Sequence, residues 1–249
     1  MFHSEKKTIF SYKDKIYPVS FSAVSLENSD KTEIEKYLGT REYEYFRSLK
    51  YRKKRHDYLL SRLSAKFAAT NLDISYIPEN ITITNGCFMQ PCLHMKNCES
   101  GYSVSITHCS NIGISVVFPD EYAVGIDLEY IDTKSADVIK EYLTENERII
   151  SRNGNDMITM MWTAKEALSK IIRTGFTANM KIFEISTTCS SDTENVFILD
   201  FLYFSNMTAY SFRFKEYIFS VVMPKNSDFS ISDIISLLKK IKEWKISVK

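Results

Sequence analysis

The chain has 249 residues, of which 44% are hydrophobic, so it can bury the core of one large domain or of two small ones. Its 32 basic and 31 acidic residues give a net charge of +1, which argues against a protein that binds nucleic acid through a large positive surplus. No run of 18 apolar residues occurs, and the N-terminus lacks the apolar core of a signal peptide, so we expect a cytoplasmic protein without a membrane span.

The cysteines fit that location. There are five, an odd number for a chain of this length, and we interpret them as reduced thiols and not as a disulfide framework. A cluster formed by Cys87, Cys92, His94 and Cys98 raises the question of zinc, but its spacing matches no established zinc pattern.

The first half of the chain predicts a strand, a helical region and further strands. Alternating polar and apolar residues predict the first strand at 17–26, followed by a short helix at 30–38. A helical pattern then runs over 41–71, with a break near 48–50 and a cap at Thr40. Its expected buried stripe consists of Tyr45, Leu49, Tyr58, Leu59, Leu63 and Phe67. Further strands are expected at 81–84, 102–107 and 112–118.

A basic cluster lies inside the helical region. Five of the seven residues at 50–56 are lysine or arginine, and Arg62 and Lys66 follow them. Such a run is usually a solvated helix face. A nucleic-acid-binding module built on this cluster is one alternative, and it would bind with a steep dependence on salt.

The second half begins with a predicted strand at 123–131, in which Asp127 and Glu129 point to the same side. Same-face positions lie roughly 6.5 to 7 Å apart along a strand, close enough for both carboxylates to reach one hard cation. The alternative is a strand edge with two solvated acids. This alternative remains open from the strand alone.

Helices follow this strand. We expect one helix at 135–142, a short one opened by a capping box from Thr144 to Glu147, and a long one at 156–174. We interpret Glu147 as structural. On the long helix Trp162, Glu166 and Lys170 fall at successive i, i+4 positions, which is also the favoured spacing of a solvent-exposed ion pair.

The remaining pattern predicts four strands of a meander, at 182–186, 196–204, 208–214 and 218–223, and a closing helix at 231–244. The order of a strand, helices and several strands therefore occurs twice, with a division near 120–123. This order predicts an α+β protein of two lobes, at 1–121 and 122–249.

Two motifs carry a resemblance to a known family. Gly125-Ile-Asp-Leu-Glu129, followed by Trp162-Thr-Ala-Lys-Glu-Ala-Leu-Ser-Lys170, resembles the signature pair of 4′-phosphopantetheinyl transferases. The resemblance implies a monomer of two pseudo-symmetric lobes, each an antiparallel sheet packed against a long helix, with the active site at their junction. It also implies transfer of phosphopantetheine from coenzyme A to a serine of an acyl or peptidyl carrier protein, with release of adenosine 3′,5′-bisphosphate.

The resemblance also assigns site residues. It implies Mg²⁺ bound by Asp127, Glu129 and Glu166, with Glu166 as the proposed base, and phosphate charge stabilised by Lys165 and Lys170. For the phosphates of coenzyme A, the expected contacts are Arg55, Arg62 and His108, with Lys53 and Lys54 as weaker candidates.

One family feature is missing. Members usually carry Gly-Lys-Pro near the predicted turn after residue 84, where this sequence reads Gly86-Cys-Phe-Met-Gln-Pro91. The missing lysine supports the other alternative, a protein that binds coenzyme A or a carrier protein without transferring anything. Otherwise, either the basic cluster upstream substitutes for this lysine, or the affinity for coenzyme A is weaker.

Overall fold

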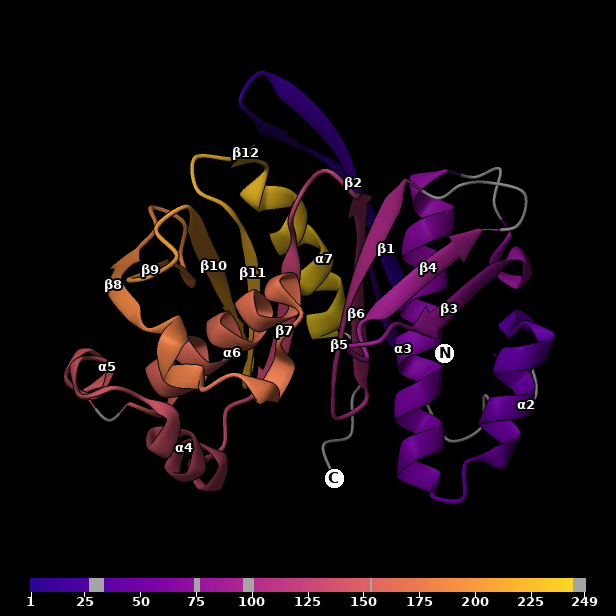
Figure 1. Cartoon of the computed structure of the whole chain (residues 1–249), viewed down its shortest axis with the longest axis horizontal. Helices are drawn as coiled ribbons and strands as arrows, with labels where there is room; N and C mark the ends of the chain where they lie inside the picture. The colour runs from indigo at the N-terminus through magenta and orange to yellow at the C-terminus, as the bar shows by residue number, and fades with distance from the viewer. Residues whose placement is uncertain (27–33, 74–76, 96–100, 153, 244–249) are drawn as a thin grey trace. The chain divides into compact units, whose positions relative to one another are not determined.

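The computed structural model describes residues 1–26, 34–73, 77–95, 101–152 and 154–243. It has the α+β architecture that the sequence predicts, with antiparallel sheets and helices (Figure 1). The chain forms two units, one made of Met1–Tyr122 with the segment that begins at Asp228, the other of Ala123–Ser227. None of the helices in the described ranges is both long and apolar enough to cross a membrane.

The first unit contains a five-stranded antiparallel sheet in the order β12-β1-β2-β6-β5. These strands are β1 (Phe2–Tyr12), β2 (Lys15–Ser25), β5 (Tyr102–Cys109), β6 (Ile112–Pro119) and β12 (Asp228–Phe229), and β3 (Ile81–Asn85) pairs with β4 (Pro91–Met95) in a separate hairpin. Strands β2, β3, β5 and β6 lie where the sequence predicts them, whereas β1 and β4 were not predicted.

The turn between β1 and β2 explains why β1 lacks a sequence signal. Lys13 and Asp14 both have positive φ, as in a type I′ turn, and the strands pair from Phe2 opposite Ser25 to Tyr12 opposite Lys15. A Lys-Asp pair is not the Asn-Gly or Asp-Gly pair that marks such turns in a sequence.

The helices of the first unit are α2 (Thr40–Ser48), α3 (Arg52–Leu72) and α7 (Ile231–Glu243), with 3-10 turns η1 (Glu35–Tyr37) and η2 (Pro78–Asn80). The predicted break near 48–50 is confirmed. Of the predicted helix at 30–38, only η1 lies within the described residues. Leu59 and Leu63 of the predicted stripe are buried, but Tyr45 is exposed and Phe46 is buried in its place.

The C-terminal segment requires a correction. The sequence predicts that the second lobe continues to residue 249, whereas β12 and α7 belong to the first unit. Phe10 of β1 pairs with Phe229, and Thr8 donates a hydrogen bond to Asp233 near the start of α7. Lys6 also forms an ion pair with Asp233 at 2.8 Å. These contacts with a strand formed at the N-terminus leave no signal in the local sequence of α7.

The second unit contains an antiparallel sheet in the order β7-β11-β10-β9-β8. Its strands are β7 (Gly125–Tyr130), β8 (Ile185–Ser190), β9 (Val196–Phe201), β10 (Met207–Phe214) and β11 (Tyr217–Pro224). Its helices are α4 (Thr133–Ile139), α5 (Glu145–Ser151) and α6 (Asn155–Ile172), with 3-10 turns η3 (Lys140–Tyr142), η4 (Gly175–Thr177) and η5 (Met180–Phe183). The predicted meander is confirmed, although its first strand begins only at Ile185.

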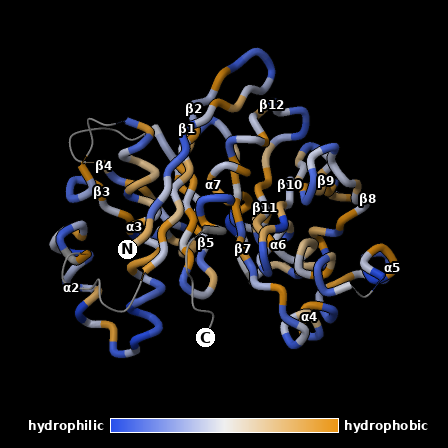
Figure 2. Tube along the Cα trace, turned by 180° about the vertical axis from the view of Figure 1, so that it is seen from behind, coloured by the Kyte–Doolittle hydropathy of each residue, from blue (hydrophilic) through white to orange (hydrophobic). Residues whose placement is uncertain are grey.

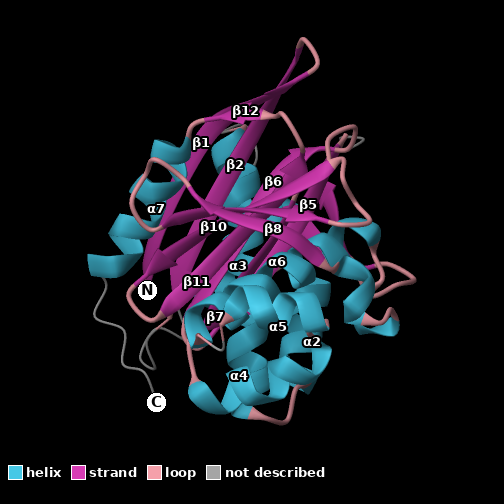
Figure 3. Ribbon diagram, turned by 90° about the vertical axis from the view of Figure 1, so that its left-hand side faces the viewer, coloured by secondary structure: helices cyan, strands magenta, loops and turns pink. Residues whose placement is uncertain are grey.

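Helix α6 is the long helix of this unit. It packs on β7, β10 and β11 through buried residues that include Ile158, Met161 and Leu168, and α4 and α5 lie beside it (Figure 3). The helix ends at Ile172, followed by Arg173 in the left-handed conformation, close to the end of the predicted helix at 156–174.

Candidate functional site

Strand β7 carries the first two predicted acids. Asp127 is buried, Glu129 is half-buried, and the two alternate with Leu128 so that they point to one side of the strand. Strand β7 stands at the end of the strand order beside β11, where Asp127 pairs in register with Ser220. The solvated-edge alternative does not describe Asp127, because only 5% of its surface is exposed.

A close approach of helix α6 brings the second motif to this strand. A Cβ atom added at Gly125 would lie 2.0 Å from the carbonyl oxygen of Ala167, so only a glycine permits this packing. The glycine of the first motif and the helix of the second motif are therefore parts of one contact.

Lys170 links helix and strand. Its ammonium lies 2.7 Å from Oδ1 of Asp127 and donates a second hydrogen bond, at 2.9 Å, to the carbonyl of Ile126. The i, i+4 spacing from Glu166 suggested a solvent-exposed pair on the helix, but this lysine binds the carboxylate on the strand. The side chain is 28% exposed, so one side of it faces solvent.

The acids of the two elements influence one another electrostatically. Burial, followed by the charge of Asp127, raises the pKa of Glu166 to about 7, while Lys170 opposes the shift. Burial, then Asp127 and Glu166, raise the pKa of Glu129 to about 8, again against Lys170. Three carboxylates thus share a partly dry environment with one lysine.

Trp162 belongs both to the core and to the site. Only 8% of its surface is exposed, and its ring lies 5.4 Å from that of Tyr142. Its side chain also hydrogen-bonds to Glu129, which opposes the rise in the pKa of that carboxylate. The indole therefore helps to orient the outer acid of the strand.

The donor set fits a hard divalent cation by its chemistry. Its three predicted ligands are carboxylates. Mg²⁺ prefers such oxygen ligands, whereas zinc commonly binds histidine and cysteine. Within the described ranges, however, no group of three or more histidine, cysteine, aspartate or glutamate side chains is arranged to hold a metal as the side chains stand.

Comparison with known families decides the relationship. The model of the 4′-phosphopantetheinyl transferase superfamily matches residues 123–222, which span β7 and α6. The matched segment, residues 123–222, is similar to this superfamily. No curated protein matches the chain. The matched segment contains all three acids of the two motifs, Asp127, Glu129 and Glu166, and it also contains Lys170.

Lys165 lies on a different side of α6 from Lys170. It is the other lysine for which the resemblance implies a contact with phosphate. Its ammonium is 2.6 Å from Oε2 of Glu147, and both side chains are 0% exposed. It also donates to the carbonyl of Tyr142 at 3.3 Å. This burial distinguishes Lys165 from Lys170, whose side chain is 28% exposed.

The sequence did not indicate that Glu147 would bind Lys165. The sequence predicts it as structural through its capping box, and the structure confirms that box. The backbone N–H of Ile185 also donates to it at 2.8 Å. The capping box was a signal for the helix start, but it could not show that the same carboxylate would bind Lys165.

The predicted coenzyme A contacts lie in the first unit. Arg55 stacks on Phe46 with 4.6 Å from its guanidinium carbon to the ring centre, and Arg62 stacks in the same way on Tyr58 at 4.6 Å. Both belong to α3, whose first residues are strongly hydrophilic (Figure 2). His108 is exposed near the end of β5.

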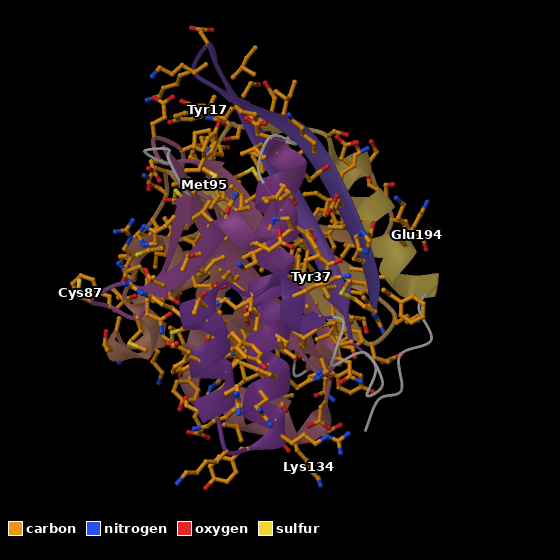
Figure 4. The ribbon with its side chains drawn as sticks, turned by 90° about the vertical axis from the view of Figure 1, so that its right-hand side faces the viewer. Tyr17, Tyr37, Cys87, Met95, Lys134 and Glu194 are labelled. Atoms are coloured by element: carbon orange, nitrogen blue, oxygen red, sulfur yellow. The ribbon has the colours of Figure 1, made fainter. Side chains whose placement is uncertain are left out.

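The turn that replaces Gly-Lys-Pro connects β3 and β4. Phe88 and Met89 are exposed there, and Met89 has a positive φ of 61°. Cys87 on this turn is also exposed, and Figure 4 labels it together with Met95, the last residue of β4. Cys92 and His94 lie in β4, where His94 hydrogen-bonds to Thr84, and Cys98 lies outside the described residues.

Proposed function

We propose that the protein transfers the 4′-phosphopantetheine group from coenzyme A to a serine of an acyl or peptidyl carrier protein, in a Mg²⁺-dependent reaction that releases adenosine 3′,5′-bisphosphate. The observation that carries this proposal is the electrostatic coupling of Asp127 and Glu129 on β7 with Glu166 on α6, in a buried environment that also holds Lys170. A surplus of carboxylate charge at that place would be costly without a cation.

The three acids would hold the metal ion. Bound there, Mg²⁺ would neutralise and orient the pyrophosphate of coenzyme A. Trp162 would keep Glu129 in place, and Lys170 would fix Asp127 while offering positive charge to the transferred phosphate. We assign phosphate binding by the first unit to Arg55, Arg62 and His108, as the superfamily resemblance implies.

Glu166 is the proposed general base. A serine hydroxyl must lose its proton as its oxygen attacks the β-phosphorus, and a carboxylate within reach accepts it directly or through water. In the metal-free protein burial raises the pKa of Glu166 to about 7, and a bound cation would favour the deprotonated form that can accept a proton. The bond from the β-phosphorus to the bridging oxygen breaks, and the leaving group carries that oxygen away.

The test is incubation of the protein with an apo-carrier protein, coenzyme A and Mg²⁺, followed by intact-mass measurement of the carrier. We expect one added phosphopantetheine per carrier, and no addition when EDTA is present. Binding of coenzyme A without any mass change over a panel of apo-carriers would instead support the non-enzymatic alternative, which the missing Gly-Lys-Pro lysine favours. The monomeric state and the cytoplasmic location remain predictions from the sequence.

A further inference from the structure

A buried carboxylate in each unit makes a similar set of bonds, although Glu42 of the first unit also lies 3.9 Å from Nε of Arg62. In the second unit, Glu147 accepts hydrogen bonds from the backbone N–H of Thr144 at 2.8 Å and from Lys165 at 2.6 Å through Oε2. Its Oε1 accepts from the N–H of Ile185, the first residue of β8, at 2.8 Å. One side chain therefore connects the start of α5, the middle of α6 and the start of β8.

Glu42 repeats this arrangement in the first unit. Its Oε2 accepts from the N–H of Gly39 at 3.1 Å and lies 2.7 Å from the ammonium of Lys66, while its Oε1 accepts from the N–H of Ile83 at 3.0 Å. The ammonium of Lys66 also donates hydrogen bonds to the carbonyl oxygens of Pro78 and Ile81. The start of α2, the middle of α3 and strand β3 are connected by the same chemistry.

The residue two positions before each lysine carries a hydroxyl that hydrogen-bonds to a serine of the sheet. Helices α6 and α3 therefore also lie in the same register against their sheets. Thr163 of α6 hydrogen-bonds to Ser220 of β11 at 2.6 Å, and Ser64 of α3 hydrogen-bonds to Ser115 of β6 at 2.7 Å. Lys165 and Lys66 are thus equivalent positions.

The equivalence shows what distinguishes the two units. Phe67 follows Lys66 where Glu166 follows Lys165. In the sheets, Ser115 pairs in register with Ser22, as Ser220 pairs with Asp127. The buried ion pair is common to both units, whereas the acids of the proposed metal site occur in the second unit alone among these equivalent positions.

The pair is suited to fixing the rotation of its helix. Both lysines are fully buried, and burial of an ammonium is unfavourable unless a carboxylate and other acceptors surround it, so few orientations of the helix satisfy it. Consecutive residues of an α-helix point about 100° apart. Fixing Lys165 toward Glu147 therefore fixes the direction in which Glu166 leaves the helix.

We propose that the buried Lys165–Glu147 pair is a positioning device that aims Glu166 at Asp127 and Glu129, and that Lys165 does not touch the phosphates of coenzyme A. This inference rests on the proposed function for its kinetic readout and on cation binding for its second readout. The equivalent Lys66–Glu42 pair holds a helix that carries no metal-site acid, and it supplies the control.

The experiment compares Lys165→Met with its matched control Lys66→Met. For each variant we would measure the melting temperature and the affinity for Mn²⁺ by electron paramagnetic resonance without coenzyme A, because Arg62, assigned to coenzyme A, contacts Glu42. For Lys165→Met we would also measure the kcat and the KM for coenzyme A. Both substitutions should lower the melting temperature, because each removes the lysine that binds a buried carboxylate; Glu42 would keep only the longer contact with Arg62. Lys165→Met should also weaken Mn²⁺ binding by about 10-fold or more and lower kcat, as loss of a residue that orients ligands does.

Two results would overturn the proposal. A large rise in the KM for coenzyme A in Lys165→Met, with unchanged Mn²⁺ affinity, would show direct phosphate binding by Lys165. Equal loss of Mn²⁺ affinity in Lys165→Met and Lys66→Met would show a general effect of destabilisation.

A second pair of variants keeps the test decisive if Lys165→Met does not fold. The double variants Glu147→Gln/Lys165→Met and Glu42→Gln/Lys66→Met remove both charges of a pair, which is tolerated better than removal of one. Only the first should weaken Mn²⁺ binding. A wild-type protein that binds Mn²⁺ without turnover would refute the proposed function and still allow this comparison, whereas a wild-type protein that binds no Mn²⁺ would overturn the positioning proposal.

Discussion

The ammonium of Lys170 lies 2.7 Å from Oδ1 of Asp127, and this ion pair joins the long helix of the second unit to its terminal strand. It compensates the charge of Asp127, one of three carboxylates that influence one another there. Both Glu129 and Glu166 have pKa values raised first by burial and then by neighbouring acids. The predictions below test this balance of charge.

Replacing Lys170 with methionine should impair the acids around it. Because Lys170 lowers the pKa of both Glu129 and Glu166, its loss should raise both values further and reduce the fraction of carboxylate available to a cation. We expect turnover to fall by roughly 100-fold and the Mg²⁺ concentration for half-maximal activity to rise. Lys134→Met, at an exposed lysine of the same unit that is labelled in Figure 4, is the control and should retain wild-type kinetics.

Glu166→Gln should separate activity from stability. The amide has nearly the same shape but cannot accept the serine proton, so kcat should fall by about 100-fold or more in the carrier-loading assay. Its charge no longer repels Asp127, and the melting temperature of the metal-free protein should therefore stay the same or rise. Turnover close to that of the wild type would remove Glu166 from the mechanism.

Stability of the metal-free protein should depend on pH in a defined direction. The pKa values of Glu166 and Glu129 rise from 4.5 to about 7 and about 8 on folding. Between pH 4.5 and 8 the folded state therefore holds protons that the unfolded state has lost. The free energy of unfolding should consequently decrease as the pH rises through this window. Urea unfolding at pH 5.5, 7 and 8.5 measures it.

The contribution of these acids to the pH dependence can be isolated with Mg²⁺ and with the glutamine variants. Because a cation binds the deprotonated carboxylates, Mg²⁺ should stabilise the protein more at pH 8.5 than at pH 5.5. Glu129→Gln/Glu166→Gln should flatten the dependence seen without metal. An equally steep decrease in this double variant would assign the effect to other groups.

Gly125→Ala should disrupt the packing of α6 on β7. The added methyl group would lie 2.0 Å from the backbone oxygen of Ala167, which cannot rotate away as a flexible side chain could. We expect a loss of roughly 3 kcal/mol in the free energy of unfolding, together with loss of carrier loading. Gly101→Ala is the matched control, because a Cβ there meets nothing within 4 Å, and its stability should change by less than about 0.5 kcal/mol.

Arg55→Gln should weaken the use of coenzyme A without weakening cation binding. Loss of a guanidinium that contacts phosphate should raise the KM for coenzyme A by about 5- to 10-fold. Lys53→Gln, at an exposed position of the same helix, should change the KM less. Equal, small effects of both substitutions would support the solvated-face interpretation of the basic cluster.

The sequence by itself determined the elements with strong local signals. The apolar period placed α3 and α6, alternation placed β5, β6 and β7, and the capping box at Thr144 and Glu147 placed the start of α5. The two motifs indicated Asp127, Glu129 and Glu166 as candidate metal ligands, because residue types and helical or strand periods are properties of the local chain.

Only the tertiary structure decided the partners of the charged side chains. Lys165 and Lys170 are five residues apart on one helix, yet one is buried against Glu147 and the other binds Asp127 on a strand. The assignment of α7 to the first unit likewise depends on β1, more than 200 residues earlier in the chain. An ion pair forms where folding brings two distant charges together and removes water from them, and no local pattern records which distant charge that will be.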